Sequence, residues 1–457
     1  MGIPTSYTPL LALIDYKDLY VQPFILSALE SRLPSASFTL VEDLPADLQG
    51  SRIQSVLQFR QYEEIDWDHA LHDPQNSLVN AYTIRKALIR KHYLSTTVHN
   101  WIVKHPESVL RRHVKAAVAF ELDYAEFLDD ALNEADSYDL QDSFAKNEGK
   151  DASQRDWWIL KPSMSDKGQG IRLFSTEEEL TAIFESWEEE GSEDLDKDSC
   201  EHDGCSSEKS GLAITNGIGL NGTNTNPDDA NEDDEGNGVV TSQLRHFIAQ
   251  PYIARPLLLA ECEDRKFHIR TYVLAVGSLR VYVYKPMLAL FAANPYTPPW
   301  STQGIHDDQE YLRTHLTNTC LQNGEREGSV KAFWDLPDED PLPSRWKTSV
   351  FSQICSTTSA LFEAAARGMM TDFQTLPFAF EVFGLDFLVD EDYTAWLLEV
   401  NAFPDFKQTG NALSGIIEGL FEDVIDVAVK PFFGLGAQDV EGTDRMTRVL
   451  DLDLGRR

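Results

Sequence analysis

The chain has 457 residues and a formal net charge of −36 at pH 7. Its length indicates two or three subdomains, and its charge argues against a general nucleic-acid or anionic-membrane surface, because phosphate groups require cationic footprints. No apolar run approaches the ~20 residues that span a bilayer, and the N-terminus lacks a secretory signal. The five cysteines are scattered and odd in number, unlike a disulfide framework. We therefore expect a soluble cytoplasmic protein with no membrane partner and no direct nucleic-acid contact.

Composition and periodicity divide the chain into four regions. Residues 1–79 contain strand-like LLALIDY, helix-like VQPFILSALESRL and strand-like SFTLVEDL, which predicts an N-terminal α/β subdomain. Residues 80–248 form a central subdomain with an acidic insertion at about 188–242, where large apolar side chains are too few to offset ordering entropy. Residues 249–433 form a C-terminal subdomain of hairpins and helices, and residues 434–457 form a flexible tail.

The central subdomain begins with a stretch of helical period. LVNAYTIRKALIRKHYLSTTVHNWIVKH and VKAAVAFELDYAEFLDDAL both predict helices. Arg85, Lys86, Arg90 and Lys91 form a local basic patch there. For most of these four residues we favour a solvated helix face.

The segment WWILKPSMSDKGQGIRLF follows, and it predicts a strand, a glycine-containing loop and a second strand. Lys161 lies on the first strand, and the loop supplies Lys167, Gly168 and Gly170. Such a loop can close backbone N–H groups over phosphates. It is not a Walker A loop, and the chain lacks the HRD and DFG motifs of protein kinases. On its own, the loop does not identify a nucleotide site.

The segment RKFHIRTYVLAVGSLRVYVYKP predicts a hairpin with its turn at residues 277–278. Strand alternation places Lys266, His268 and Arg270 on one face, and the register places Lys285 opposite Arg270. Two adjacent cations are unfavourable without an anion between them. The hairpin therefore indicates phosphate or carboxylate recognition, with a solvated strand face as the alternative.

A last hairpin, FEVFGLDFLVDEDYTAWLLEVN at residues 380–401, gathers three oxygen-bearing side chains on one face. If residues 392–393 form a two-residue loop, Asp386 pairs directly with Glu399, and Asn401 lies on the same face. Oxygen ligands of this kind suit Mg²⁺ beside a phosphorylated ligand. The alternative is a half-exposed sheet with a solvated acidic face.

The order of these segments resembles the tubulin-tyrosine ligase-like family of ATP-grasp ligases. The resemblance rests on the lysine strand and glycine loop, FIAQPYI, RKFHIRTYVL, the last hairpin and HLTN at residues 315–318. It covers residues 80–407, apart from the acidic insertion. It implies an α/β (α+β) ATP-grasp fold of three subdomains, with the nucleotide clamped between two mostly antiparallel sheets. Similar fungal proteins are associated with mRNA processing bodies, which adds P-bodies to the expected cytoplasmic location.

The resemblance also implies roles for individual residues, with ATP and Mg²⁺ as cofactors. Residues implied to bind the nucleotide are Lys91, Lys161, Lys167, Gly168, Gly170, Gln250, Tyr252, Lys266 and His268. Residues implied in catalysis are Arg270, Lys161 and Glu399, and the metal ligands are Asp386, Glu399 and Asn401. His315, Thr317 and Asn318 have secondary roles, for which turn capping is the alternative.

Two positions depart from the family pattern. His268 stands where the family usually has Asp, which alters the expected ribose contacts. Leu290, in MLALFAANPY, stands where an arginine is expected to bind a substrate carboxylate, and leucine cannot do so.

The resemblance implies a ligase that adds an amino acid to a protein or peptide acceptor through an acyl phosphate. Tubulin tyrosination is one candidate reaction, although Leu290 and the acidic charge weaken it. An ATP-binding scaffold that has lost ligation and a ligase with a non-tubulin substrate are the alternatives.

Overall fold

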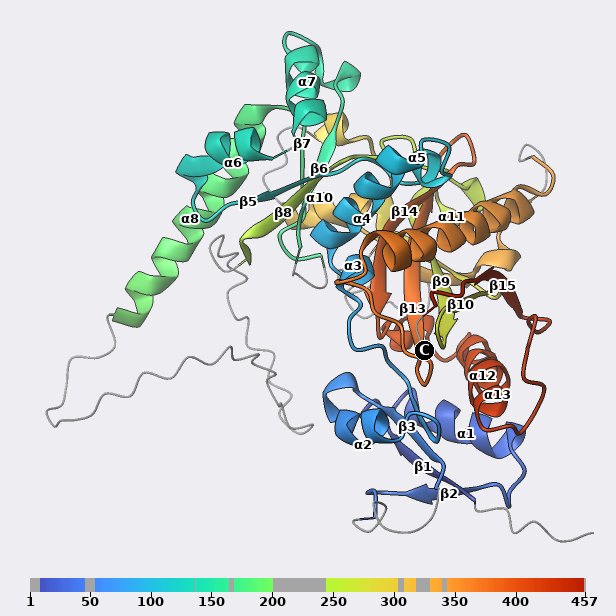
Figure 1. The fold of residues 1–457 in the computed structure, drawn as a ribbon. Helices are drawn as coiled ribbons and strands as arrows, with labels where there is room; N and C mark the ends of the chain where they lie inside the picture. The colour runs from blue at the N-terminus through green and yellow to red at the C-terminus, as the bar shows by residue number, and fades with distance from the viewer. Residues whose placement is uncertain are drawn as a thin grey trace, which may run out of the picture.

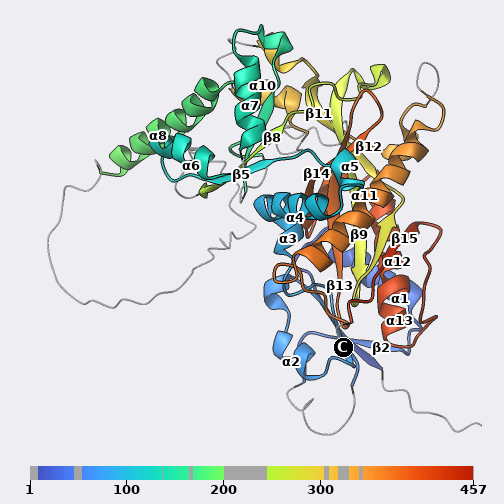
Figure 2. The same cartoon turned by 45° about the horizontal axis from the view of Figure 1, so that its top comes forward.

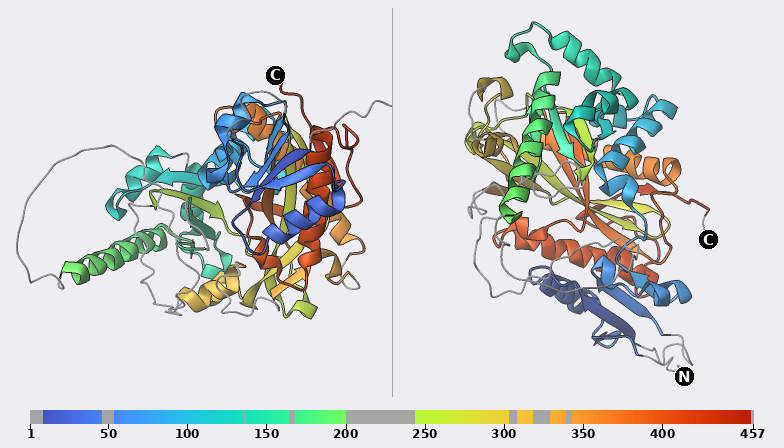
Figure 3. Two further views of the ribbon diagram at one scale, coloured as in Figure 1. Left: turned by 90° about the horizontal axis from the view of Figure 1, so that it is seen from below. Right: turned by 90° about the vertical axis from the view of Figure 1, so that its left-hand side faces the viewer.

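The structure, a computed structural model, describes residues 9–45, 54–135, 137–163, 168–199, 244–302, 308–317, 329–338 and 343–455. Within these ranges the strands form three sheets. The N-terminal sheet and the central sheet lie at opposite ends of the molecule, with the largest sheet between them (Figure 1 and Figure 3). No helix in the described ranges is long and apolar enough to cross a bilayer.

The N-terminal sheet is parallel, with strand order β2-β1-β3-β4. The strand, helix and strand predicted from the sequence are confirmed as the first three elements, and two further strands complete the sheet. The elements are β1 (Leu10–Asp15), α1 (Gln22–Arg32), β2 (Phe38–Val41), β3 (Val56–Arg60), α2 (Trp67–His72) and β4 (Ser77–Val79).

The central sheet is antiparallel, with order β5-β8-β6-β7, and three helices cover one of its faces (Figure 2). The strands are β5 (Val118–Glu121), β6 (Trp158–Pro162), β7 (Arg172–Phe174) and β8 (His246–Pro251). The helices are α6 (Leu128–Glu134), α7 (Tyr138–Asn147) and α8 (Glu177–Ser199). The other face, which carries Lys161 and Gln250, is turned toward the largest sheet.

Two predictions fail in this region. VAFE is a strand rather than part of a helix, because it pairs with β8 and its alternating side chains enter the apolar core. The acidic insertion was expected from residue 188, but α8 continues to Ser199. Glutamate favours a helix, and three glutamates lie in the first turn of α8. The rest of the insertion, residues 200–242, lies outside the described residues.

The largest sheet runs β12-β11-β9-β10-β15, and in addition β13 pairs with β9 and β14 pairs with β13. Its strands are β9 (Arg265–Val276), β10 (Arg280–Tyr284), β11 (Leu288–Pro295), β12 (Val330–Ala332), β13 (Phe380–Val389), β14 (Ala395–Ala402) and β15 (Met446–Asp451). Around it lie α3 (Lys86–Ile89), α4 (Lys91–Lys104), α5 (Leu110–His113), α10 (Asp308–His315), α11 (Trp346–Gly368), α12 (Ser414–Val424), a π-helical turn (Ile425–Val429) and α13 (Lys430–Phe432).

The two faces of this sheet have different chemistry. One face is apolar along its whole length and packs against α3, α4 and α11. On the other face, the half nearer the N-terminal sheet packs against α1 and α12. The remaining half of that second face carries Lys266, His268, Arg270 and Asp386. This face changes from charged to apolar within β9. The charged residues end at Arg270, and Tyr272 and Leu274 follow on the same face.

The C-terminal tail and one register were predicted wrongly. Residues 446–451 do not fray, because β15 pairs antiparallel with β10 and Arg445 binds the carboxylates of Glu422 and Asp423. Lys285 does not lie opposite Arg270 either. The turn has three residues, so Arg280 pairs with Val276, and the pairing of β10 with β9 ends at Val283 and Val273, before Lys285 is reached. The neighbours of Arg270 are instead Leu288 and Asp386.

One member of the basic patch is not solvated. Arg85 Nε lies 2.9 Å from Glu381 Oε1, and Glu381 is 1% exposed. The backbone N–H of Tyr82 donates to the other Glu381 oxygen at 3.1 Å. Burial raises the pKa of Glu381 to about 7, although Arg85 opposes that rise. This pair joins the segment before α3 to β13.

Replacing Arg85 with Met should lower the free energy of unfolding by about 3–5 kcal/mol at pH 8, because an ionised Glu381 then stays buried without its cation. The double variant Arg85→Met/Glu381→Met should recover most of this loss. At pH 5, where the buried carboxyl is protonated, the cost of Arg85→Met should shrink. Urea denaturation followed by tryptophan fluorescence measures all three. Equal stability of the single and double variants at pH 8 would contradict the pair's role.

Candidate functional site

The β13–β14 hairpin brings the two predicted metal-binding carboxylates together. Asp386 pairs with Glu399, as expected, although the loop length and the register of the hairpin differ from the prediction. The loop has five residues, 390–394, rather than two, and the register then shifts because Leu398 has no partner on β13. This bulge restores the pairing that the longer loop would have displaced by one residue.

Arg270 and Asp386 form a buried bidentate ion pair across β9 and β13. Arg270 Nε donates to Asp386 Oδ1 at 2.5 Å, and a terminal nitrogen donates to Oδ2 at 3.0 Å. The two residues are 6% and 3% exposed. Burial alone would lower the pKa of Arg270, but the Asp386 carboxylate raises it overall. Asp386 is therefore already neutralised by the guanidinium predicted to act in catalysis.

Asn401 and Lys91 complete the acidic cluster. The Asn401 amide donates to Asp386 Oδ2 at 3.3 Å and to Glu399 Oε1 at 3.2 Å. Lys91, the first residue of α4, places its Nζ 3.9 Å from Glu399 Oε2. Burial opposes ionisation of Glu399, but Lys91 and Lys161 outweigh it and hold its pKa at about 2. Glu399 is thus ionised throughout the physiological range.

Two buried lysines face this cluster. Lys161 on β6 donates to Gln250 Oε1 on β8 at 3.0 Å. Lys266 on β9 donates to the Tyr252 hydroxyl at 3.0 Å. Burial lowers the pKa of Lys161 to about 8, and burial together with Lys161 lowers that of Lys266 to about 7. Both cations are therefore poorly solvated, and a phosphate group would raise both pKa values.

The first three residues of HLTN, His315 to Thr317, line the same cavity as these lysines. His315 Nδ1 is 2.9 Å from the Tyr252 hydroxyl, and the Thr317 hydroxyl is 2.5 Å from His268 Nδ1. His268 Nε2 lies 3.6 Å from Asp386 Oδ1 and has no hydrogen-bond partner in the described part of the chain. Burial lowers the pKa of His268, which keeps the ring neutral. His315 and Thr317 thus position ring and phenol groups here rather than only capping a turn.

The structure describes the glycine loop only from Gly168 onward. Gly168 and Gly170 have φ values of 80° and 70°, which favour glycine. Lys167 and Asn318 lie outside the described residues. Leu290 is fully buried in the apolar core beside His268, so it offers nothing to a carboxylate.

Most of these groups line one cavity between the central sheet and the largest sheet. It is lined by Lys161, Gln250, Tyr252, Lys266, His268, His315, Thr317, Asp386 and Glu399. Its apolar wall, which sequence reasoning missed, consists of Ile159, Ile171, Ile253, Leu316, Leu388, Leu397 and Leu398. Lys115 was also missed, and its sequence signal is no more than a cation that follows Arg111 and Arg112 shortly before β5. The cavity holds about 90 Å³, below the ~300–1,000 Å³ of typical ligand sites, so a ligand of ordinary size could enter only if the sheets separate.

The acidic cluster fits a hard divalent cation by donor type. Two carboxylates and one amide supply oxygen atoms, the ligands that Mg²⁺ prefers. In the described residues, however, no group of three or more His, Cys, Asp or Glu is arranged around a metal position. Arg270 and Lys91 neutralise the carboxylates instead. A metal must therefore displace part of this ion-pair network.

Comparison with known proteins agrees with this geometry. The family model described as "Tubulin-tyrosine ligase family" matches residues 69–434. A probable tubulin–tyrosine ligase of Schizosaccharomyces pombe is 43% identical over 421 residues, covering 92% of this chain and 91% of the relative. The probable tubulin–tyrosine ligase PBY1 of Saccharomyces cerevisiae is 41% identical over 442 residues, covering 94% of this chain. This chain spans only 54% of that longer relative.

One solved structure extends the comparison to the fold. The C-terminal domain of K. lactis Pby1 superposes with a TM-score of 0.67 at 36% identity, over 97% of this chain and 99% of that one. That protein is described as an ATP-grasp enzyme that interacts with the mRNA decapping enzyme Dcp2. The predicted fold class, an α/β ATP-grasp fold with antiparallel sheets, is confirmed. The chain belongs to the tubulin-tyrosine ligase family.

Proposed function

We propose that this protein is an ATP-dependent carboxylate–amine ligase that adds an amino acid to a protein or peptide acceptor. The observation that carries the proposal is the cluster around Asp386, where two carboxylates, an amide and the cations Arg270 and Lys91 meet. Lys161 and Lys266 face this cluster from two sheets. Such a set can neutralise a triphosphate and position an attacking carboxylate.

The reaction has two balanced steps. A carboxylate oxygen of the acceptor attacks the γ-phosphorus of ATP, the bond to the β–γ bridging oxygen breaks, and ADP leaves. The amine nitrogen then attacks the acyl carbon, inorganic phosphate leaves, and the amine loses one proton to solvent. Lys161 and Lys266 would hold phosphate oxygens, and Arg270 would stabilise developing negative charge through N–H groups not used by Asp386. Asp386, Glu399 and Asn401 would hold Mg²⁺, which when bound neutralises phosphoryl oxygens.

An ATP-binding scaffold without ligation is the second candidate. Leu290 favours it, because this fully buried side chain occupies the position at which the family resemblance implies a substrate-binding arginine. The K. lactis relative interacts with a decapping enzyme, and a similar partner would place this protein in cytoplasmic mRNA processing bodies. A non-tubulin acceptor is compatible with both Leu290 and the net charge of −36.

Turnover should depend on Glu399. We expect ADP release when the purified protein is screened with amino acids and detyrosinated tubulin, and Glu399→Gln should reduce kcat by at least about 100-fold. Glu391→Gln is the matched control, since Glu391 is exposed in the loop of the same hairpin and pairs with Arg255. Turnover that survives Glu399→Gln would contradict the metal assignment. ATP binding without ADP release across the whole screen would favour the scaffold.

Nucleotide binding should take up protons. At pH 8, most Lys266 side chains are neutral, because their pKa is about 7, and a bound triphosphate raises this pKa and draws in about one proton. Calorimetry in buffers of different ionisation enthalpy measures the uptake. In the Lys266→Arg variant the arginine is already charged at this pH. Its binding of the nucleotide should therefore lose most of the proton uptake. Equal uptake by the wild type and this variant would show that Lys266 does not meet the phosphates.

A further inference from the structure

The strand that carries two of the three proposed metal ligands ends in a strained turn. β14 contains Glu399 and Asn401 and ends at Ala402, and the next residue, Phe403, has a φ of 51°. A positive φ is uncommon for residues other than glycine, and a bulky side chain in this region marks a turn under strain. Such a conformation persists only where the surrounding structure enforces it. Contacts with Phe403 must therefore hold the turn.

The contacts that hold the Phe403 ring come from segments far away in the sequence. The centroid of the buried Tyr16 ring, just after β1, lies 6.2 Å from that of Phe403. The Arg85 guanidinium carbon lies 5.2 Å from the centre of the Phe403 ring and 4.1 Å from that of Tyr62. Arg85 is itself fixed by its pairing with the buried Glu381. An aromatic ring and a cation thus hold Phe403 from outside the β13–β14 hairpin.

The next residue, Pro404, lies close to Arg270. Pro404 is buried, and its Cβ is 2.8 Å from the position that a Cβ on Gly384 would take. Arg270 Cδ is 3.3 Å from the same position. Gly384 pairs with Asn401 across the hairpin. Pro404, the Arg270 side chain and the end of β14 therefore share one small region of the sheet.

The segment after Pro404 is attached to the N-terminal subdomain at two further points. Lys407 Nζ lies 3.9 Å from Asp18 Oδ2. The Tyr20 hydroxyl donates to the carbonyl oxygen of Gly410 at 3.0 Å. Asp18 and Tyr20 follow β1 directly, as Tyr16 does. One end of the N-terminal sheet thus contacts the chain that leaves the metal-binding strand.

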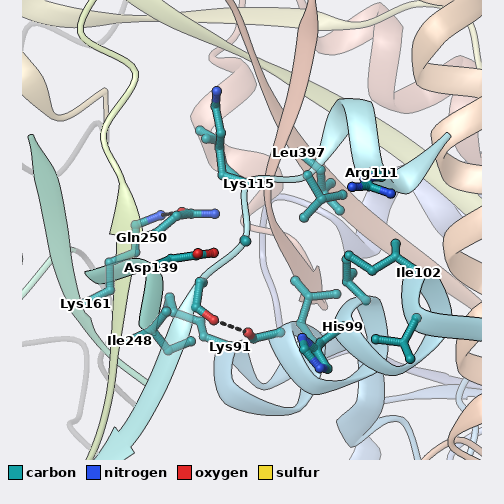
Figure 4. A pocket seen from close by; sticks show the side chains of 18 of the residues that line it. Lys91, His99, Ile102, Arg111, Lys115, Asp139, Lys161, Ile248, Gln250 and Leu397 are labelled. Carbon is teal, nitrogen blue, oxygen red and sulfur yellow. Dashed lines mark hydrogen bonds between the residues drawn. The ribbon is translucent and has the colours of Figure 1, made fainter. Parts of the chain in front are cut away.

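The middle of β14 borders open space on one side. There Leu397 lines a cavity of about 550 Å³ that Lys91 and Lys161 also line (Figure 4). A void supplies no packing contacts to the side chains around it. The position of Asn401 therefore depends on the pairing of β14 with β13 and on the turn at Phe403.

We propose that Phe403 is a positioning residue for the metal end of the site. Its ring, held by Tyr16 and Arg85, fixes the strained turn, and the turn keeps the Asn401 amide against the two carboxylates that it contacts. This inference rests on the metal assignment and the ligase function proposed above. It adds the N-terminal subdomain to the parts of the molecule that shape the site.

Metal binding by the full chain tests the inference directly. Mn²⁺ takes the same oxygen ligands as Mg²⁺, and EPR can follow its titration in the presence of a non-hydrolysable ATP analogue. Phe403→Ala should weaken Mn²⁺ binding by at least about tenfold, whereas Phe403→Tyr, which keeps the ring, should stay within about twofold of the wild type. Affinity for the analogue without metal should not change, because Phe403 is not among the described residues that line the proposed nucleotide cavity. No Mn²⁺ binding by the wild type, or equal affinity in Phe403→Ala, would overturn the inference.

Tyr393 provides the matched control. It lies in the loop at the opposite end of the same hairpin and also has a positive φ, of 61°. Tyr393→Ala should leave Mn²⁺ affinity unchanged, because this loop is remote from Asn401 along both strands. A loss as large as that in Phe403→Ala would indicate general loosening of the hairpin and would count against a specific role for Phe403.

Phe403→Gly keeps the test decisive if Phe403→Ala fails to fold. Glycine adopts a φ of 51° without strain, so the turn stays accessible while the ring is lost. This variant should fold and still bind Mn²⁺ at least about threefold more weakly, because the ring no longer holds the turn. Wild-type affinity in Phe403→Gly would show that the ring does not position Asn401.

Turnover separates this inference from the ligase proposal. In Phe403→Ala, the Mg²⁺ concentration that gives half-maximal ADP release should rise at least about tenfold, and excess Mg²⁺ should restore most of kcat. If Mn²⁺ affinity falls as expected but the wild type releases no ADP, the positioning role stands and the ligase proposal falls. If ADP release depends on Glu399 while Phe403→Ala binds Mn²⁺ like the wild type, the ligase proposal stands and the positioning role falls.

Discussion

Arg270 and Asp386 are buried against each other on the face of the largest sheet, and the geometry of the site follows from that pair. Taking two charges out of water costs several kcal/mol for each, which only a well-aligned partner can offset. The bidentate contact supplies this alignment, and the pairing of β9 with β13 fixes it. Gly384 leaves the necessary room, since a Cβ there would lie 2.8 Å from Pro404 Cβ and 3.3 Å from Arg270 Cδ.

The charges of the site are satisfied within the protein before any ligand arrives. Lys161 is bound to Gln250, Lys266 to Tyr252, and Glu399 is paired with Lys91. A ligand that binds here must therefore exchange existing contacts for new ones, and the net gain in free energy is the difference between them. This exchange lets a chain of strongly negative charge keep a cationic cleft without leaving bare charges buried.

Local patterns in the sequence predicted much of the site, and non-local contacts account for most of what they missed. Alternation within each strand correctly placed Lys266, Arg270 and Asp386 on one face, because the side-chain period of a strand is two wherever the strand pairs. The pairing of Asp386 with Glu399 was right through two compensating errors, the loop length and the bulge. Lys285 was misplaced because the turn has three residues rather than two, and β15 was missed because its partner, β10, is far away in the sequence. The union of Arg85 with Glu381 likewise joins segments far apart in the chain.

The separation of Arg270 and Asp386 along the chain also bears on how the protein is made. The two residues are 116 positions apart, so β9 leaves the ribosome well before its partner strand β13 exists. During that interval β9 can pair with β10 and β11 along one edge, but its other edge lacks β13 and Arg270 lacks its carboxylate. The proposed nucleotide cleft is consequently among the last parts of the molecule to form during synthesis, and a chain interrupted before residue 386 exposes one unpaired edge of β9 to its neighbours.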